Sequence, residues 1–329
     1  MTGVNALVSR AAWANFSDLF AAGTSGVCWW LMDPDGAVHP APGPTTAGPV
    51  SPPEPEVAWL SNDVFRDSTL EPMTERLLSS PALRWVQSGA AGTDTPLLEG
   101  LIRQGTRLTT SHVTAIPIAE YVLSAVLNIY QQPGQWADSS RNHQWKHRNF
   151  AEVHGTTWLV VGLGGIGHEV AVRARAFGAR VIGVRQTPTG REPVDEVITP
   201  DGLGGAVPDA DVIVLCAPGS ADTHHLFDEA MLALVREGAV LVNVARGSLV
   251  DEPALIRALD RGRPAHAVLD VFAIEPLPPD SPLWDHPQVT VTPHSSGGGL
   301  GRYRRSAEVF AVNLARYLRD EPLLHEVDR

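Results

Sequence analysis

The sequence contains very little lysine and cysteine, and each shortage excludes a class of chemistry. Lys146 is the only lysine against 24 arginines. A Walker-type phosphate loop needs a lysine after its glycines, and Schiff-base catalysis needs a lysine amine, so the chain has almost no room for either. The two cysteines, Cys28 and Cys216, show no spacing that suggests a disulfide, and we expect both to be small buried hydrophobic residues.

Long apolar runs and signs of an anionic partner are also missing. No apolar stretch approaches the ~20 residues that a membrane helix needs. The first residues lack a basic segment followed by an apolar one, so no signal peptide is expected and the cytoplasm is the predicted location. The net charge of −12 argues against nucleic acid or an anionic membrane as a partner. The spacings H-E-x-x-H and G-x-S-x-G are absent, and no metal is expected.

One glycine-rich segment, residues 156–167, is the most informative part of the sequence. An apolar stretch typical of a buried strand leads into G-x-G-x-x-G, and a helical pattern starts near His168. In this setting the first glycine allows a tight turn, the second lets the backbone approach a pyrophosphate, and the third lets the helix pack on the strand. The unpaired amides of the helix start would face the phosphates. An ordinary glycine-rich turn is the alternative, but the context favours a dinucleotide site at Gly162, Gly164, Gly165, Ile166 and Gly167.

At 329 residues the chain is long enough for two α/β domains. In the first part we expect strands at 5–8, 56–60 and 83–87 and a helix at 65–78. The Pro-, Gly- and Ser-rich residues 33–56 are expected to form an irregular excursion with neither helix nor strand. A long buried helix is expected at 116–127, and a last helix at 302–319 is expected to return to cover the first domain. Between them, six short apolar strands alternating with helices predict a doubly wound parallel sheet, at residues 158–161, 181–184, 212–216, 240–244, 267–271 and 289–291.

Charged side chains follow several expected strands of that sheet. Arg246, Asp270 and His294 each lie at the carboxyl end of an expected strand, and Glu275 lies in the loop after one. Because ligands of such sheets bind at this edge, we expect these side chains to gather there. Each has a structural alternative when taken alone: a surface ion pair for the arginine, and a turn position for the residues beside prolines.

Together with the glycine segment, these motifs resemble the D-isomer-specific 2-hydroxyacid dehydrogenase family, near its glyoxylate and hydroxypyruvate reductases. The resemblance extends over residues 86–303 and includes four motifs in the same order. It implies an α/β fold of two Rossmann-like domains. The doubly wound cofactor domain, residues 113–296, would be inserted into a flavodoxin-like substrate domain of residues 1–112 and 297–329. It also implies an NAD(P)-dependent oxidoreductase that transfers hydride between the cofactor and a small 2-oxo acid or D-2-hydroxy acid, such as glyoxylate, hydroxypyruvate or pyruvate.

The resemblance also implies a role for each site residue. Arg246 is expected to bind the substrate carboxylate and carbonyl oxygen, because a planar guanidinium offers paired donors. His294 is expected to be the acid–base that protonates the carbonyl oxygen, with Glu275 holding the imidazole and favouring its charged form. Asp270 is expected to meet the nicotinamide carboxamide. Backbone amides of a loop in the first domain are expected to bind the substrate carboxylate, at Ala90, Ala91 and Gly92. Further cofactor contacts are expected at Cys216, Ala217, Pro218, Val244, Ala245 and Ser296.

Arg185 decides the expected choice of cofactor. An NAD enzyme places an acid ~20 residues past its first glycine. Here Arg185 stands 23 residues past Gly162, and no acid appears before Glu192. Since a guanidinium attracts the 2′-phosphate that a carboxylate would repel, NADP(H) is the expected preference and NAD(H) the other cofactor that the site would accept. Stacking of Arg185 on the adenine without selection is the alternative.

A dinucleotide-sensing binding protein of the corepressor type, built on the same scaffold, is the alternative function. Members of the family are usually homodimers joined through the cofactor domain. We therefore expect a homodimer, with the arm at residues 130–150 and its Trp136 and Trp145 at the contact. The expected partners are a small-molecule acid and a second copy of the chain, with no nucleic acid or membrane.

Overall fold

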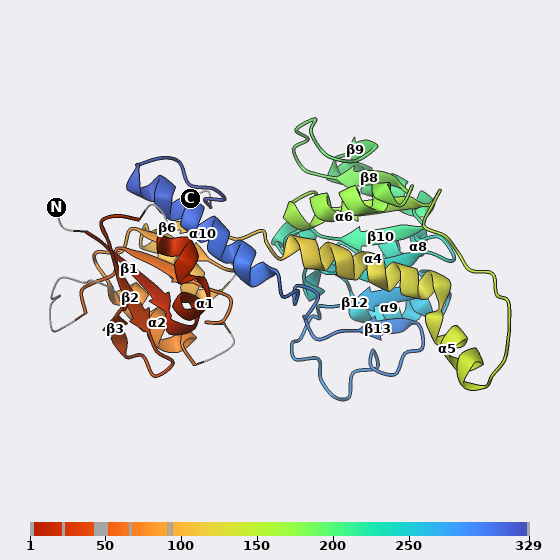
Figure 1. Ribbon diagram of the computed structural model, residues 1–329. Helices are drawn as coiled ribbons and strands as arrows, with labels where there is room; N and C mark the ends of the chain where they lie inside the picture. Colours follow the sequence, from red (N-terminus) through yellow and green to blue (C-terminus); the bar gives the residue numbers. More distant parts are fainter. Residues whose placement is uncertain are drawn as a thin grey trace. The chain divides into compact units, whose positions relative to one another are not determined.

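The computed structural model describes residues 3–21, 24–42, 52–65, 68–90, 92 and 95–327. The chain divides into two compact units (Figure 1). One contains Met1–Thr114 and Leu300–Arg329, and the other contains Ala115–Gly299. The second unit is therefore continuous in sequence and inserted into the first.

The first unit is built on a six-stranded sheet in the order β3-β2-β1-β4-β5-β6. All neighbouring strands pair in parallel except β3, which pairs antiparallel with β2 at the sheet edge. The order of the five parallel strands is that of flavodoxin-like folds. The strands are β1 Val4–Ser9, β2 Val27–Met32, β3 Val38–Pro40, β4 Val57–Leu60, β5 Trp85–Ser88 and β6 Arg107–Thr109.

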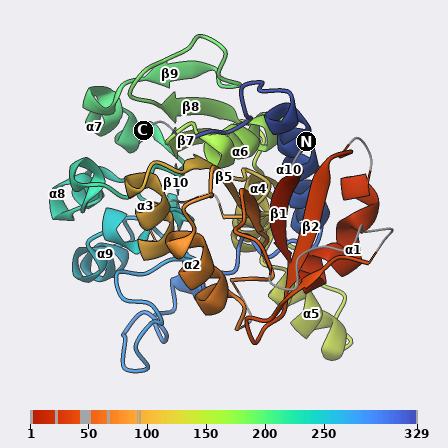
Figure 2. The ribbon, with the colours of Figure 1, turned by 90° about the vertical axis from the view of Figure 1, so that its left-hand side faces the viewer.

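Helices cover both faces of this sheet, because alternate residues of its strands belong to different apolar clusters. Leu7 packs on the side of α2 and α3, and Ala6 and Val8 pack on the side of α1 and α10. Figure 2 shows these two helix layers. The helices are α1 Arg10–Ala21, α2 Leu70–Ser79, α3 Pro96–Arg103 and α10 Arg302–Leu318. Phe310 of α10 stacks on Trp59 and Trp85, so the last helix does return to cover the first unit, as expected.

The expectation of an irregular excursion at residues 33–56 was wrong for its first part. A turn, in which the Gly36 amide donates to the Asp33 carbonyl at 2.9 Å, leads into β3. Pro40 is tolerated there because β3 is an edge strand with one unpaired side. Residues 43–51 lie outside the described part of the chain.

The second unit is built on a seven-stranded sheet in the order β13-β12-β11-β10-β7-β8-β9, with every pair parallel. The order reverses between β7 and β10, as in Rossmann folds, and ligands of such sheets bind at that point. The six expected strands are all present, and β9 is an additional one. The strands are β7 Thr157–Val161, β8 Arg180–Val184, β9 Glu196–Ile198, β10 Val212–Leu215, β11 Val240–Asn243, β12 His266–Leu269 and β13 Val289–Val291.

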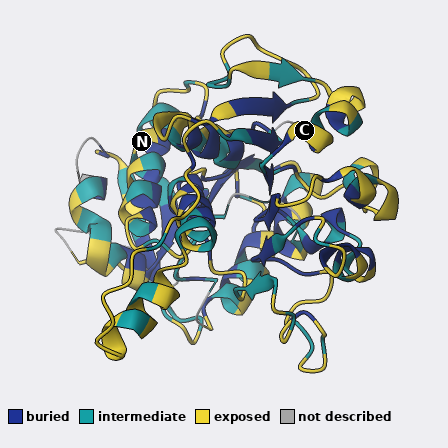
Figure 3. Cartoon of the chain, turned by 90° about the vertical axis from the view of Figure 1, so that its right-hand side faces the viewer, coloured by how far each residue is buried: buried dark blue, intermediate teal, exposed yellow. Residues whose placement is uncertain are grey.

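Both faces of this sheet are also covered, as expected for buried parallel strands. Trp158 and Val160 pack on the side of α4 and α6, whereas Leu159 and Val161 pack on the side of α7, α8 and α9. Figure 3 shows the central strands buried and the exposed residues concentrated in loops and outer helix faces. The helices are α4 Ala115–Gln131, α5 Pro133–Arg141, α6 Gly165–Ala176, α7 Leu203–Ala206, α8 Glu229–Leu234 and α9 Glu252–Leu259. Among the described residues, no helix has the length and apolar character to cross a bilayer.

Candidate active site

The glycine-rich segment forms a tight turn between β7 and α6. Gly162 has φ +97°, and a Cβ on it would lie 2.6 Å from the Ala217 amide nitrogen, so only glycine fits. A Cβ on Gly167 would lie 1.9 Å from the Gly162 carbonyl oxygen, so α6 packs directly on the turn. Gly164 differs, because a Cβ there would meet no heavy atom within 4 Å. The turn is thus packed on its inner side and open at Gly164.

This turn fits the pyrophosphate of a dinucleotide. Gly164 is the N-cap of α6, and Gly165 and Ile166 begin its first turn. The amides there have no partner within the helix, and the helix dipole adds positive potential at the same point. The open space at Gly164 lies where a phosphate must approach the backbone.

The loops that follow successive strands contact one another along this sheet edge. Gly162 packs on Ala217 after β10, and a Cβ on Gly219 would lie 3.1 Å from Cγ of Arg246 after β11. A Cβ on Gly247 would lie 1.8 Å from the carbonyl carbon of Phe272 after β12. The edge therefore runs without interruption from the glycine turn to the residues that follow β12.

Arg246 and His294 lie on this edge because their strands end in register. Asn243 of β11 pairs with Leu269 of β12, which pairs with Val291 of β13. Arg246 is half-buried, and its Nη1 donates to the Ala245 carbonyl at 2.8 Å. Gly219 is the small residue that leaves room for the Arg246 side chain.

His294 and Glu275 form a direct pair. His294 Nδ1 lies 2.7 Å from Glu275 Oε2, and the other carboxylate oxygen accepts from the Phe272 amide at 3.0 Å. A carboxylate on Nδ1 makes that nitrogen the proton-bearing one in the neutral ring, which directs Nε2 to other partners. The His294 side chain is 54% exposed, so a small molecule can reach it. The pair has the geometry of an acid–base imidazole oriented by a carboxylate.

Asp270 is buried and surrounded by hydrogen-bond donors from the loop that carries His294. It is 1% exposed, and its carboxylate accepts hydrogen bonds from the Thr292 hydroxyl at 2.6 Å, the Ser295 amide at 2.8 Å and the Ser296 amide at 3.0 Å. Tyr121 of α4 lies 2.8 Å from the same Thr292 hydroxyl. Asp270 thus fastens the loop that carries His294. Tyr121 and Thr292 were given no role from the sequence, because the fold and not the motif brings their hydroxyls together beside Asp270.

The hydrogen bonds to Asp270 also hold the backbone conformation of His294. Its φ is +48°, a conformation that side-chain-bearing residues rarely adopt, and its amide donates to the Asp270 carbonyl at 2.8 Å. Ser296 is 7% exposed and donates its hydroxyl to Asp270 at 2.5 Å. The expected cofactor contacts of Asp270 and Ser296 would form in addition to these hydrogen bonds.

The remaining expected cofactor residues lie around the glycine turn. The Cys216 amide donates to the Val161 carbonyl at 2.8 Å, so Cys216, Ala217 and Pro218 continue the edge after β10. Val244 and Ala245 follow β11 and are each 4% exposed. Arg185 follows β8, and its Nη1 donates to the carbonyl of Leu163, within the glycine turn, at 3.3 Å. All of these expected residues therefore belong to one edge of one sheet.

The expected substrate loop belongs to the first unit, and the hydrogen bonds of Ala90 are with residues of that unit. The Ala90 amide donates to Ser88 Oγ at 3.1 Å, and its carbonyl accepts from the Ser111 amide at 3.1 Å. A substrate carboxylate would have to share or replace the first of these bonds. Ala91 lies outside the described residues, and Gly92 is described.

A pyrophosphate turn at the reversal of strand order, on the same edge as an arginine and a carboxylate-bound histidine, defines the class of nicotinamide-dependent dehydrogenases. Comparison with known proteins agrees. The family model for the NAD-binding domain of D-isomer specific 2-hydroxyacid dehydrogenases matches residues 123–296. The chain belongs to this family.

Curated relatives and solved structures give the same family. A glyoxylate reductase of Pyrococcus horikoshii is 31% identical over 255 residues, which is 74% of this chain and 75% of that one. A D-3-phosphoglycerate dehydrogenase of Mycobacterium tuberculosis is 36% identical over 223 residues, but these are 67% of this chain and 42% of the relative. The crystal structure of a D-isomer specific 2-hydroxyacid dehydrogenase family protein from Aeromonas salmonicida superposes with a TM-score of 0.78 at 27% identity, covering 100% of this chain and 99% of that one.

A second solved structure includes a cofactor. It is an NADPH-dependent glyoxylate/hydroxypyruvate reductase from Sinorhizobium meliloti, in complex with NADP and sulfate. Its TM-score is 0.73 at 25% identity, with 99% of this chain and 98% of that one covered. The protein is accordingly an oxidoreductase that binds a nicotinamide dinucleotide and acts between 2-oxo and 2-hydroxy acids. The corepressor alternative gains no support from these comparisons.

Proposed function

We propose that this enzyme reduces a small 2-oxo acid, glyoxylate or hydroxypyruvate, to the D-2-hydroxy acid with NADPH. The observation that carries the proposal is the 2.7 Å pair of His294 and Glu275 on the sheet edge that also holds Arg246. The glyoxylate reductase relatives and the NADP-bound glyoxylate/hydroxypyruvate reductase support the choice of substrate.

Each catalytic residue has one task in this reaction. The guanidinium of Arg246 binds the substrate carboxylate and polarises the carbonyl oxygen through paired donors. A reduced nicotinamide, when bound, would supply the hydride that the carbonyl carbon receives. His294 gives a proton to the carbonyl oxygen, and the Glu275 carboxylate stabilises the imidazolium before that transfer. Amides of the first unit, at Ala90, Ala91 and Gly92, complete the binding of the substrate carboxylate.

The dinucleotide would be held by the glycine turn and the loops beside it. Gly164, Gly165, Ile166 and the α6 amides bind the pyrophosphate, and Gly162 and Gly167 shape the turn. Asp270 positions the His294 loop and accepts from the nicotinamide carboxamide. The remaining contacts are proposed for Cys216, Ala217, Pro218, Val244, Ala245 and Ser296.

The preference for NADPH depends on Arg185. Its guanidinium lies against the glycine turn, where a charged donor would pair with a 2′-phosphate. Solved relatives that contain NADPH or NADP support this assignment. Steady-state assays should give a lower KM for NADPH than for NADH, and Arg185→Asp should reverse the order. A lower KM for NADH in the unmodified enzyme would overturn the preference.

The function itself is tested with a panel of 2-oxo acids and both cofactors. We expect NADPH oxidation at ordinary enzyme rates with glyoxylate and hydroxypyruvate. His294→Gln should lower kcat by about 10²- to 10⁴-fold while cofactor affinity stays unchanged. Arg261→Gln is the control, because Arg261 is exposed and precedes β12 at the amino end of the strands, whereas the site lies at their carboxyl ends. Saturable NADPH binding without turnover of any 2-oxo acid would contradict the proposal.

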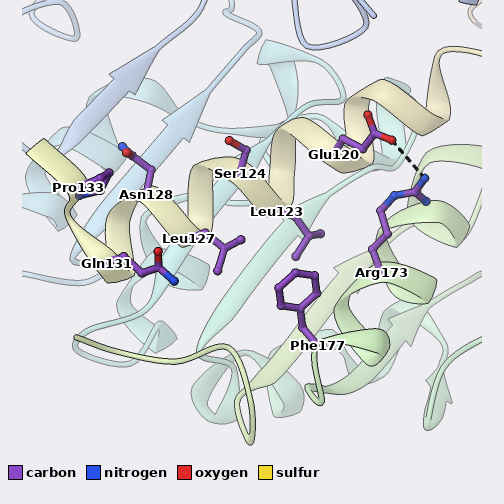
Figure 4. A pocket seen from close by; sticks show the side chains of 9 residues that line it. All are labelled: Glu120, Leu123, Ser124, Leu127, Asn128, Gln131, Pro133, Arg173 and Phe177. Atoms are coloured by element: carbon purple, nitrogen blue, oxygen red, sulfur yellow. Dashed lines mark ion pairs between the residues drawn. The ribbon is translucent and has the colours of Figure 1, made fainter. Parts of the chain in front are cut away.

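We further propose a homodimer formed through the arm at residues 130–150 of the cofactor-binding unit. Trp145 is 93% exposed, Phe150 is 48% exposed, and Phe177 of the adjoining face is 48% exposed. Beside the arm lies an open groove of about 540 Å³ (Figure 4), lined by Glu120, Leu123, Ser124, Leu127, Asn128, Gln131, Pro133, Arg173 and Phe177. So much exposed aromatic surface is characteristic of an interface, and a second copy of this face is the proposed occupant.

Light scattering after size exclusion tests the dimer. The expected mass is twice that of the 35.3 kDa chain. Phe177→Glu should produce monomer, because it places a charge on the apolar interface. Val312→Glu is the matched control, since Val312 is 47% exposed but belongs to α10 of the first unit. A monomeric unmodified protein, or equal effects of the two variants, would refute the proposal.

The cytoplasm is the proposed location. Free small molecules are the proposed partners, with no nucleic acid or membrane, because a net charge of −12 repels the phosphates of nucleic acids and anionic lipids. Retention on heparin, or sedimentation with anionic vesicles, at physiological salt would contradict this choice of partners.

A further inference from the structure

The loop after β8 folds back on itself around the carboxylate of Glu192. Glu192 Oε1 accepts from the Thr189 amide and from the Thr189 hydroxyl, each at 2.7 Å. Glu192 Oε2 accepts from the Arg191 amide at 3.0 Å. The Arg185 guanidinium completes the set, with Nη1 3.6 Å from Glu192 Oε1. Four donors from three residues therefore converge on one carboxylate.

This donor set suits a phosphate as well as a carboxylate. Backbone amides, a hydroxyl and an arginine are the groups that bind phosphate oxygens in proteins. The Glu192 side chain is only 2% exposed, so it fills the space enclosed by the donors. The Thr189 hydroxyl and amide lower the pKa of Glu192 to about 2, so the carboxylate stays ionised at any working pH. The loop is an anion cradle that already holds an anion from its own chain.

The cradle lies at the part of the fold that faces the adenosine ribose in our proposal. Arg185 connects it to the glycine turn through the Leu163 carbonyl at 3.3 Å. We propose that Glu192 is a specificity-determining residue whose carboxylate occupies the cradle of the NADPH 2′-phosphate and competes with it. This inference rests on the proposed contact of Arg185 with that phosphate.

The competition acts on one cofactor only. The 2′-phosphate of NADPH must displace Glu192 from Thr189, Arg191 and Arg185, and the two anions repel each other. The 2′-hydroxyl of NADH is uncharged and needs no such displacement. Glu192 thus narrows the difference in affinity between the cofactors that Arg185 alone would produce.

Glu192→Gln tests this competition, because it removes the charge and keeps the shape. Dissociation constants for NADPH, NADH and adenosine 2′,5′-bisphosphate would be measured by calorimetry at low ionic strength. We expect about tenfold tighter binding of NADPH and of the bisphosphate, with the NADH constant unchanged within about twofold. Glu196→Gln is the matched control, since Glu196 of β9 pairs with Arg180 of β8 on an exposed surface. It should change none of the three constants.

Three results would overturn the inference. Unchanged NADPH binding in the folded variant would mean that Glu192 does not compete. Weaker binding of NADH alone would mean that Glu192 binds the ribose hydroxyl. Weaker binding of both cofactors with a lower Tm would make Glu192 a structural staple of the loop.

Arg185→Ala separates this failure from a failure of the proposed cofactor preference. If Arg185→Ala leaves NADPH binding unchanged, the phosphate contact itself is wrong. If Arg185→Ala weakens NADPH binding while Glu192→Gln has no effect, the preference stands and the competition is refuted. In the double variant the gain from Glu192→Gln should shrink, because the two side chains act on the same phosphate.

Discussion

Gly247→Ala should disable catalysis through the backbone alone, without touching any proposed catalytic side chain. The added Cβ would lie 1.8 Å from the Phe272 carbonyl carbon and 2.1 Å from its oxygen, whereas real contacts of a Cβ are essentially never below 3.0 Å. The main chain must therefore move by more than 1 Å. The Phe272 amide donates to Glu275, which holds His294, so the movement reaches the acid–base directly.

The size of the effect follows from that displacement. A misplacement of about 1 Å at a reacting group costs roughly 10² in rate. Overpacking of this kind also costs about 1–3 kcal/mol of unfolding free energy. We therefore expect kcat to fall about 100-fold, with a smaller change in the dissociation constant for NADPH, because the pyrophosphate turn after β7 lies three strands away from β12.

The assay is NADPH oxidation with glyoxylate, together with thermal unfolding and cofactor titration. Gly205→Ala is the matched control, since a Cβ there meets nothing within 4 Å and Gly205 lies in α7 with ordinary φ. It should leave kcat unchanged. A Gly247→Ala enzyme that is folded and retains full kcat would refute the close packing of the Arg246 loop on the Glu275 loop.

Three further predictions concern the same unit. Glu275→Gln should lower kcat about 10- to 100-fold with unchanged NADPH affinity, because the amide cannot stabilise the charged ring of His294; steady-state kinetics would check this. Asp270→Asn should lower the unfolding free energy by about 1–3 kcal/mol, since the new amide donor faces only donors; urea unfolding measures it, and an unchanged value would contradict the fastening role. Burial, and then nearby His286, lower the pKa of His266 below 6.5, so the unfolded chain binds the proton more readily. The contribution of His266 to the free energy of unfolding is therefore present above about pH 6.5 and is lost as the pH falls below it. Between pH 8 and pH 5, the Tm of His266→Gln should accordingly fall less than the Tm of the unmodified protein.

The parallel sheet of the second unit could be predicted because its strands are buried on both faces. Such strands read as continuous apolar runs, and the six expected runs all became strands. The seventh strand, β9, was missed because it has no such apolar run. It is a three-residue edge strand with an exposed Glu196 and only half-buried neighbours, so no apolar run marks it.

The first unit was harder to predict because its signals conflict. β2 is an apolar run, but it precedes a proline-rich stretch that suggested an irregular excursion. β3 ends in Pro40, which excludes a central strand and is allowed only because the strand lies at an edge. Edge position is a property of the assembled sheet, so the local sequence could not supply it.

Glu192 shows a second limit of reading by spacing. The rule for cofactor choice looks for an acid at a fixed distance from the first glycine, which assumes that the chain leaves the strand directly. Here the chain turns back at Thr189, so that Glu192 lies within 3.6 Å of the Arg185 side chain that appeared to stand without an acid. Counting along the sequence identified Arg185 but could not place its neighbour.

The same sheet edge contains two kinds of residue, and distance past the strand end separates them. Asp270 follows β12 directly, is 1% exposed, and is surrounded by donors from its neighbouring loop. Arg246 and His294 each stand three residues past their strands, where the chain has left the core and a side chain can reach a ligand. A buried carboxylate directly after a strand needs fixed hydrogen-bond donors, and Asp270 takes them from the loop that carries His294. Asp270 therefore supports that loop. Motifs record both kinds of residue alike, whereas the hydrogen bonds around Asp270 distinguish it from Arg246 and His294.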